Sequence, residues 1–251
     1  WYDITKLNHA GQDGGDVTYP YFIINGRVAK DPQVADYRTG QRIRMRVINA
    51  GSDTAFRVAV PGTSMTVIQT DGYPVMPVQA DSVILGMGER VDAIITVNES
   101  LPVIAVPYGK PGHAQLNMRV NNRPATVNVD EFVGSVRTQE PLDTATLSPA
   151  PEVTLPAKAP DQIIDARLAG PVDGYNWPIN GKLYEPPRDG VAVQPNQRVR
   201  IRYINESMMF HPFHLHGHTF QVMNGDTPKA RKDTVLVPPL QRLLFVQLPL
   251  V

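Results

Sequence analysis

Four of the six histidines in the chain lie within eight residues, in the stretch HPFHLHGH, and they are His211, His214, His216 and His218. Imidazole nitrogen is a ligand of copper, zinc, iron and nickel, so a group this dense predicts a metal site. Every ring nitrogen of a buried row of histidines would also need a partner. We therefore favour metal binding over a solvated polar face or a set of core histidines.

The spacing of these histidines limits how they could share metal ions. If the stretch is a strand, alternate side chains share a face, so His214, His216 and His218 would have neighbours ~6.6 Å apart and an outer pair ~13 Å apart. One ion cannot easily bind all three. Two ions, or one ion with a single histidine and ligands from elsewhere, fit that geometry better. Pro212 favours an extended conformation at His211, which we expect to enter the strand and to serve a different site.

The longer segment HPFHLHGHTF resembles the carboxy-terminal copper motif of the multicopper oxidases, the family of laccases and related bacterial oxidases. Cupins also carry His-x-His on a strand, but with a glutamate a few residues on, where this chain has TFQV at 219–222. The resemblance implies that His211 binds the type 1 copper, His214 the type 2 copper and His216 one of the type 3 pair. His218 matches a recurrent histidine of the motif that is not counted as a ligand, and no catalytic residue is implied beyond the metal ligands.

Length and composition suggest two β-rich domains. A chain of 251 residues exceeds the usual single domain, and its 24 prolines suit many turns and edges rather than long helices. The 24 basic and 24 acidic residues include no basic run, so we expect no nucleic-acid partner, and no apolar run approaches the ~20 residues of a membrane span. The absence of cysteine leaves no disulfide and no thiolate ligand in these residues.

Alternation of apolar and polar residues supports this β-rich interpretation. Arg42, Arg44 and Arg46 alternate with apolar residues, which predicts a half-buried strand with a solvated arginine face. Asn25-Gly26 predicts a hairpin turn. His9 and His113 have no histidine nearby and are expected to be solvent-exposed. Further short strands are predicted at 55–60, 65–70, 81–85, 90–97, 103–107 and 114–120.

An internal repeat organises the chain. Residues 24–27 (INGR) recur at 179–182 (INGK), an offset of 155, and residues 41–49 (QRIRMRVIN) recur at 197–205 (QRVRIRYIN), an offset of 156. Two copies of one β-domain explain this recurrence most simply. Aligning Phe56 with Phe210 predicts that the first copy has the same scaffold without the histidines, whose places are taken by Arg57, Val60, Gly62 and Ser64.

The repeat fits the resemblance, because multicopper oxidases are built from repeated cupredoxin domains and the middle domain of three-domain members lacks copper ligands. Residues 85–92 (LGMGERVD) also look like that middle domain. The expected fold is all-β, with two tandem cupredoxin-like Greek-key β-sandwich domains. We expect a copper-free domain at 1–125, a proline-rich connector at 126–160 lying across the surface, and a copper-binding domain at 161–251 that is incomplete at its carboxy-terminal end.

Two departures from the family pattern limit what these residues could do alone. The two His-x-His motifs of a first domain and the final His-Cys-His motif are not in this sequence. Residues 100–120 have no counterpart in the second copy, whose last residues, 243–251, lack polar alternation and read as a divergent tail or as residues joined across missing ones. We expect the chain alone to be inactive, with a missing first domain or partner chain docking on the face shared by His214 and His216, and His211 turned toward the place of the absent cysteine loop.

Three functions from different classes remain open. The favoured one is a copper-dependent oxidase that oxidises a phenolic, aromatic or metal-ion substrate and reduces dioxygen to water. The resemblance implies that such a protein is secreted or lies in the periplasm or cell envelope. A two-domain relative fits less well, since such proteins carry ligands in the first copy. The alternatives are a copper-binding module without turnover and a structural cupredoxin-fold protein that has lost its copper.

Overall fold

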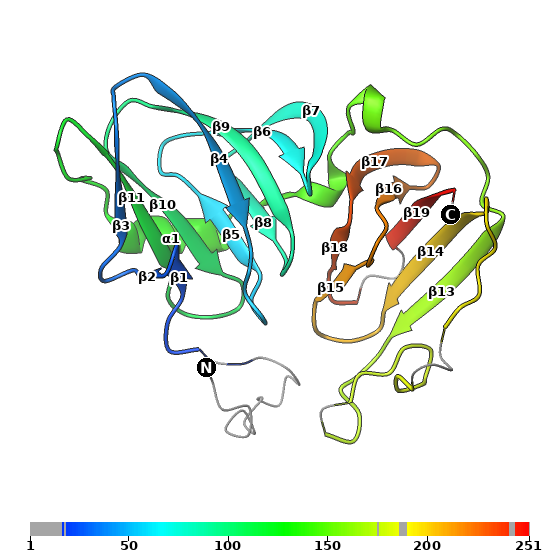
Figure 1. Ribbon diagram of the computed structural model, residues 1–251. Coiled ribbons are helices and arrows are strands. Elements are labelled where there is room, and N and C mark those ends of the chain that lie inside the picture. The colour runs from blue at the N-terminus through cyan, green and yellow to red at the C-terminus, as the bar shows by residue number, and fades with distance from the viewer. Residues whose placement is uncertain (1–16, 18, 175, 186–189, 241–243, 251) are drawn as a thin grey trace. The chain divides into compact units, whose positions relative to one another are not determined.

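The computed structural model divides into two compact units between Thr144 and Ala145. We call residues 19–144 the first domain and residues 145–250 the second domain. Residues 126–144 of the expected connector thus belong with the first domain, and residues 145–160 with the second. Both domains are built from β-sheets, which confirms the all-β prediction (Figure 1). The structure describes residues 17, 19–174, 176–185, 190–240 and 244–250.

The first domain contains two main sheets. One has six strands in the order β12-β8-β5-β10-β11-β3, and the other has four in the order β4-β9-β6-β7. Because neighbours within a sheet are mostly not consecutive in sequence, the chain crosses between the sheets repeatedly, as in a Greek-key sandwich. The strands are β3 (Gln33–Tyr37), β4 (Gln41–Ile48), β5 (Phe56–Ala59), β6 (Met65–Thr70), β7 (Tyr73–Ala80), β8 (Ser82–Leu85), β9 (Arg90–Val97), β10 (Leu101–Pro107), β11 (Ala114–Val120) and β12 (Leu142–Asp143).

These strands lie close to where the sequence predicts them. In β4 the burial alternates residue by residue, with the three arginines exposed and Ile43, Met45 and Val47 turned inward, as the period-2 pattern requires. The Asn25-Gly26 turn joins β1 (Ile23–Ile24) to β2 (Arg27–Val28) with φ values of 51° and 78°. Both residues occupy the left-handed region that a tight hairpin turn needs and that Asn and Gly tolerate best.

The second domain repeats this plan. Its larger sheet has the order β13-β14-β19-β16-β17, and a two-stranded sheet joins β15 and β18. β14 and β16 both pair with β19, just as β4 and β6 both pair with β9. Asn180 and Gly181 also reproduce the turn of the first copy, with φ values of 53° and 75°. The strands are β13 (Gln162–Leu168), β14 (Arg198–Asn205), β15 (His211–His214), β16 (Phe220–Asn224), β17 (Thr227–Lys232), β18 (Thr234–Val237) and β19 (Leu244–Leu250).

The interpretation of residues 243–251 as a divergent tail is wrong for the described part of that segment. β19 lies in the middle of the larger sheet, between β14 and β16. Its residues Val246, Gln247 and Leu248 are all buried. A central strand covered on both faces loses the polar alternation that was used to search for strands, which is why the sequence pattern failed here.

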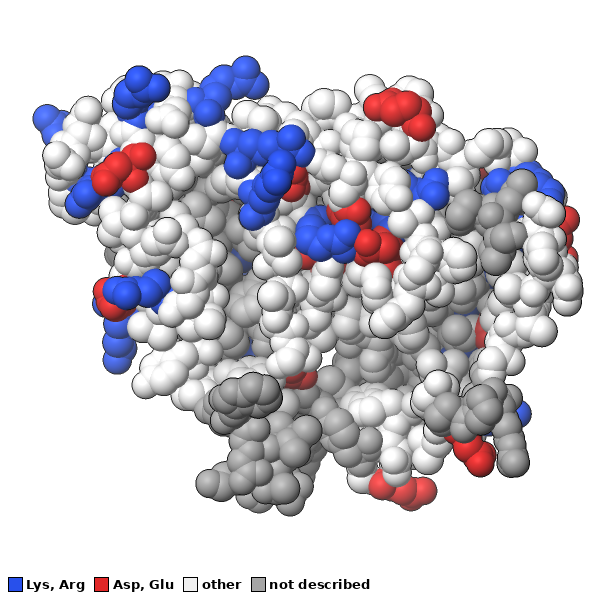
Figure 2. All heavy atoms as spheres, viewed as in Figure 1, with Lys and Arg blue, Asp and Glu red and all other residues white. Residues whose placement is uncertain are grey.

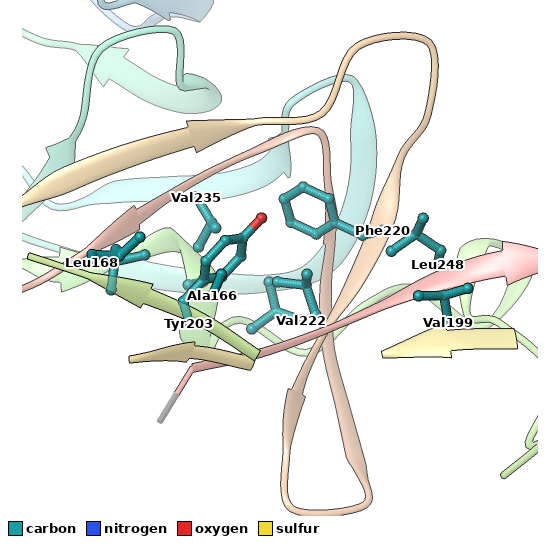
Figure 3. Packing of buried hydrophobic residues seen from close by; sticks show 11 residues of the cluster. Ala166, Leu168, Val199, Tyr203, Phe220, Val222, Val235 and Leu248 are labelled. Atoms are coloured by element: carbon teal, nitrogen blue, oxygen red, sulfur yellow. The ribbon is translucent and has the colours of Figure 1, made fainter. Parts of the chain in front are cut away.

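The core of the second domain forms between its two sheets. Phe220 is fully buried, and Tyr203 is 6 % exposed. Burial raises the pKa of the Tyr203 phenol well above its ordinary value, because the charged form would be poorly solvated. The Tyr203 ring packs on Phe213 with their centroids 4.5 Å apart, which ties β14 to β15. Figure 3 shows the cluster, whose labelled members are Ala166, Leu168, Val199, Tyr203, Phe220, Val222, Val235 and Leu248.

In each domain a buried asparagine holds together one corner of the sandwich, where a strand of one sheet ends and the chain crosses to the other sheet. Asn205 is 2 % exposed and is the last residue of β14. Its amide donates to Met209 O (2.6 Å) and Pro238 O (2.8 Å), and its oxygen accepts from Ser207 N (3.0 Å). These bonds hold the loop before β15 against the end of β18. The equivalent Asn49 makes the matching set in the first domain, to Thr54 O, Leu85 O and Gly51 N.

One helix, α1 (Val129–Thr138), lies in the region expected to be a connector. Asn128 caps it by accepting from Glu131 N, and its buried residues Val133 and Val136 pack on the face of β5 and β10. The helix is short, with ten residues, but it buries one apolar face. The proline-rich composition of this region did not predict it.

The second domain lacks counterparts of several of these elements in the part of the chain that the structure describes. β5 pairs with β8 on one side and β10 on the other, whereas β15 pairs only with β18 among the described strands. Among the described strands, β15 therefore has one neighbour where β5 has two.

Charged side chains are mixed over the face drawn in Figure 2. Lys and Arg lie beside Asp and Glu there, and broad areas carry neither. Some acidic and basic side chains of the described residues form ion pairs, such as Arg119 with Asp36 at 2.6 Å. Among the described helices, none has the length and apolar character needed to cross a membrane.

Candidate metal centre

The histidine-bearing strand β15 is short and held from one side. His211 lies opposite Val237 of β18, and His214 lies opposite Thr234. Since alternate residues of a strand share a face, His211 points to the same side as Phe213, which packs on the core, and His214 points to the other side. The two histidines therefore lie on opposite faces of β15.

The expectation that His214, His216 and His218 form a row on one strand is wrong. β15 ends at His214, and a turn follows at His216–Gly217, where Gly217 has a φ of 73°. A residue with a Cβ rarely adopts that conformation, so the glycine permits the strand to end here. The His214 and His216 rings lie side by side, with centroids 5.0 Å apart and planes at 58°. Both side chains, and that of His218, are exposed.

His214 is oriented by the neighbouring strand. Its Nδ1 lies 2.9 Å from Asp233 O and 3.0 Å from Thr234 Oγ1. A carbonyl oxygen can only accept, so Nδ1 carries the proton and donates it there. In the neutral ring the lone pair then sits on Nε2, which is the arrangement found in metal-binding histidines. The Thr234 hydroxyl in turn donates to Asp233 Oδ1 at 2.9 Å, which leaves its own lone pairs for the ring.

His211 occupies a more enclosed position on the opposite face of β15. Its Nε2 lies 2.8 Å from the hydroxyl of Ser207, and the Trp177 ring meets it edge-on with centroids 5.4 Å apart. Burial lowers the pKa of His211, because the charged imidazolium would lose solvation. The ring is thus biased toward its neutral form, the form that binds metals.

The first domain carries a cation where the second has its first histidine. Arg57 is the counterpart of His211 in the repeat, and it donates through Nη1 to Val136 O (3.0 Å) and Arg137 O at the end of α1. Its guanidinium also lies over the Tyr108 ring, 5.3 Å from the centroid. An arginine is not a metal ligand, so this position is structural in the first copy, as the sequence predicted.

The other two histidines contribute no such cluster in the described residues. His113 is partly buried rather than exposed, and its Nε2 lies 3.4 Å from Gln115 Oε1. The expectation of full exposure is wrong because the Gly112 turn leads directly into β11, where the ring lies beside strand residues. His9 lies outside the described residues.

The histidine nitrogens are suitable ligands for copper, but the described residues supply only part of a copper site. Imidazoles with one nitrogen held by a backbone or hydroxyl oxygen are suitable copper ligands. Within the described residues, however, no three His, Cys, Asp or Glu side chains come together to hold one ion. His214 and His216 would hold neighbouring copper ions, and His211 would hold a separate one, each with further ligands from elsewhere.

Comparison with known proteins gives the family. Two sequence profiles described as multicopper oxidase match residues 1–105 and 143–246. The multicopper oxidase MmcO of Mycobacterium tuberculosis (strain ATCC 25618 / H37Rv) is 40 % identical over 244 residues, covering 95 % of this chain and 47 % of that protein. The chain belongs to the multicopper oxidase family. This family is a class of oxidoreductases that use copper centres.

Other relatives agree with this assignment. Laccase-1 of Pleurotus ostreatus is 27 % identical over 282 residues, covering 94 % of this chain and 52 % of its own length. The chain therefore spans about half the length of these curated relatives. Among solved structures, Fet3p, a multicopper oxidase that functions in iron import, aligns with a TM-score of 0.72 at 16 % identity, over 88 % of this chain and 53 % of its own. A Campylobacter jejuni multicopper oxidase aligns over 97 % of this chain and 54 % of its own at 18 % identity, with a TM-score of 0.67, which shows the shared cupredoxin-like fold.

Sequence reasoning found the histidines but missed the groups that orient them. Asp233, Thr234, Ser207 and Trp177 come from other strands and loops, and no motif links them to the histidine stretch. One signal was available in the repeat, because the second copy has Ser207 two residues after the shared asparagine, where the first copy has a glycine.

Proposed function

We propose that the protein containing this chain is a copper-dependent oxidase that takes electrons from a small phenolic, aromatic or metal-ion substrate and passes them to dioxygen. The observation that carries this proposal is the His214–His216 pair, with rings 5.0 Å apart and His214 held by Asp233 and Thr234 so that Nε2 is free to ligate. Bound copper would supply one-electron oxidation and the reduction of dioxygen to water.

The residues of this chain have separate tasks in the proposal. His211, half-buried against Trp177, belongs to the site that accepts electrons from the substrate, the type 1 position. His214 and His216 belong to the type 2 and type 3 positions, where dioxygen is reduced. Their rings are exposed, so a further domain or a partner chain can approach them to complete the ligand set. By the same family resemblance, we place the protein in the secreted or periplasmic compartment.

The test replaces single histidines in the natural protein that contains this chain. We expect His214→Ala to lower the copper content and to reduce dioxygen consumption with a phenolic donor by at least about 100-fold, since loss of groups that merely support a ligand already costs about 10- to 100-fold. His218→Ala is the matched control, because His218 is equally exposed in the same motif and is not assigned as a ligand. Equal losses in both variants, or full activity of His214→Ala, would contradict the assignment.

A copper-binding module without turnover is the second candidate. The observation that favours it is the His214–His216 pair, whose neighbouring rings would suffice to bind copper without a complete oxidase site. The same samples separate the two functions, since a binding module would retain copper through His214 and show no dioxygen consumption beyond that of free copper.

The 251 residues tested alone should behave differently from the natural protein. The chain contains no cysteine, so a blue copper site with its thiolate ligand cannot form within it. We expect weak copper binding, no blue absorption band and no sustained dioxygen consumption from this chain alone. A blue band would overturn this expectation.

A further inference from the structure

The hydroxyl of Ser207 is the hydrogen-bond partner that the described part of the chain gives to the His211 ring. Ser207 is 5 % exposed, and its Oγ lies 2.8 Å from His211 Nε2. The same oxygen lies 2.8 Å from Asn205 Oδ1 and 3.2 Å from both the nitrogen and the oxygen of Met209. A buried hydroxyl with this many neighbours has its single proton fixed by what those neighbours can accept.

The proton of that hydroxyl can be placed by counting donors and acceptors. Asn205 is oriented by its network, because its amide nitrogen donates to Met209 O and Pro238 O and its oxygen accepts from Ser207 N. Asn205 Oδ1, at 2.8 Å, and Met209 O, at 3.2 Å, are both acceptors that lie against Ser207 Oγ, so the single hydroxyl proton lies toward these two oxygens. Met209 N is a donor and points into Ser207 Oγ. The remaining lone pair of Oγ can only accept, so His211 Nε2 must carry a proton and donate it to Ser207.

The internal repeat shows whether the Ser207 hydroxyl is needed to hold the loop after Asn205. In the first domain Asn49 keeps the same bonds to Thr54 O, Leu85 O and Gly51 N, so the corner is closed without any hydroxyl. Gly51 stands at the position of Ser207, and Arg57 stands at the position of His211. The asparagine is present in both copies, whereas the serine occurs only in the copy that has the histidine. Closing the corner thus does not require Ser207.

We propose that Ser207 is a positioning residue for His211: its buried hydroxyl holds the imidazole as the Nε2–H tautomer and leaves the Nδ1 lone pair to bind copper. This inference rests on the proposed function for the copper part, while the tautomer follows from the hydrogen bonds alone. It also gives His211 and His214 opposite ligating nitrogens, since Asp233 O holds His214 through Nδ1.

The tautomer can be measured directly by nitrogen NMR of the natural protein, copper-free and labelled with ¹⁵N-histidine, at a pH where the ring is neutral. We expect His211 to show a protonated Nε2 and an unprotonated Nδ1. In Ser207→Gly, which installs the residue of the first copy, and in Ser207→Ala, this preference should fall by about fivefold, the effect of losing one net hydrogen bond. Ser207→Thr keeps a hydroxyl and should restore the preference.

The control is Ser100→Ala. Ser100 is 9 % exposed, and its hydroxyl also joins a buried network, to Val120 N (2.8 Å) and Arg123 O (2.7 Å) in the first domain. This variant should leave the His211 tautomer unchanged. An unchanged tautomer in the Ser207 variants, or an equal change in Ser100→Ala, overturns the inference.

Copper measurements distinguish this failure from failure of the proposed function. With copper added, we expect Ser207→Gly to weaken binding at the His211 site by about 10- to 100-fold. If His211→Ala instead retains the full copper content, the assignment of His211 as a ligand fails, whatever the NMR result for Ser207.

Discussion

Replacing Asn205 by alanine should destabilise the second domain strongly. The change removes three short hydrogen bonds, to Met209 O, Pro238 O and Ser207 N, each contributing about 1 kcal/mol net. Ser207 is buried, so leaving its N–H without an acceptor adds about another 1 kcal/mol. The expected loss is about 3 to 4 kcal/mol, a large part of the about 5 to 15 kcal/mol that holds a typical domain folded.

The assay is denaturant unfolding followed by the fluorescence of Trp177, which lies in the second domain against His211. The chain contains two tryptophans, so Trp1→Phe makes Trp177 the only reporter. Asn205→Asp is a second variant of the same shape. Its carboxylate can only accept, and it would face the carbonyls of Met209 and Pro238, so we expect a loss at least as large as that of the alanine variant.

Asn49→Ala provides the matched control in the first domain. Asn49 is 6 % exposed and makes the equivalent bonds to Thr54 O, Leu85 O and Gly51 N. It should leave the Trp177 transition in place while lowering the stability of its own domain, measured by circular dichroism. A shift of less than about 1 kcal/mol for Asn205→Ala, or an equal shift of the Trp177 transition for Asn49→Ala, would refute the reasoning.

Three further outcomes are expected. The Arg202 hydrogen bond lowers the pKa of Asp165, so this pair stabilises the fold fully above the ordinary pKa of 3.8, and the contribution is lost as the pH falls through the lowered folded value. Asp165→Asn should therefore flatten the acid side of a plot of melting temperature against pH. An unchanged slope would contradict this. Phe220→Ala, at a fully buried position, should cost about 3 to 5 kcal/mol in the same fluorescence assay, and a loss below about 1 kcal/mol would mean that the core is not packed as described. Thr234→Val removes the hydroxyl beside His214 Nδ1 and should weaken copper binding of the natural protein by about tenfold with little change in melting temperature, whereas a large loss of stability with unchanged affinity would show a structural role.

Local sequence was sufficient for most of the strands and for the duplication. The arginine alternation of β4 and the Asn-Gly turns depend on neighbours within a few residues, and the recurrence of QRIRMRVIN is visible in the sequence itself; the structure agrees with each of them. The same local logic found the four histidines, because a dense set of metal-binding side chains is visible without knowing the fold. It failed at β19, since a strand buried on both faces has no alternation to detect.

The arrangement of the histidines was decided by tertiary structure. A uniform strand would have continued through His216 and His218, but β15 ends at His214 and a turn follows at His216–Gly217, with the His214 and His216 ring centroids 5.0 Å apart. The ring nitrogen that each histidine offers depends on its partners, and these come from the β14–β15 loop for His211 and from the start of β18 for His214. Sequence alone therefore determined which residue types are available for metal binding, and only the packing of distant strands determined their orientation, because hydrogen bonds between residues far apart in the chain form only once the sheets are assembled.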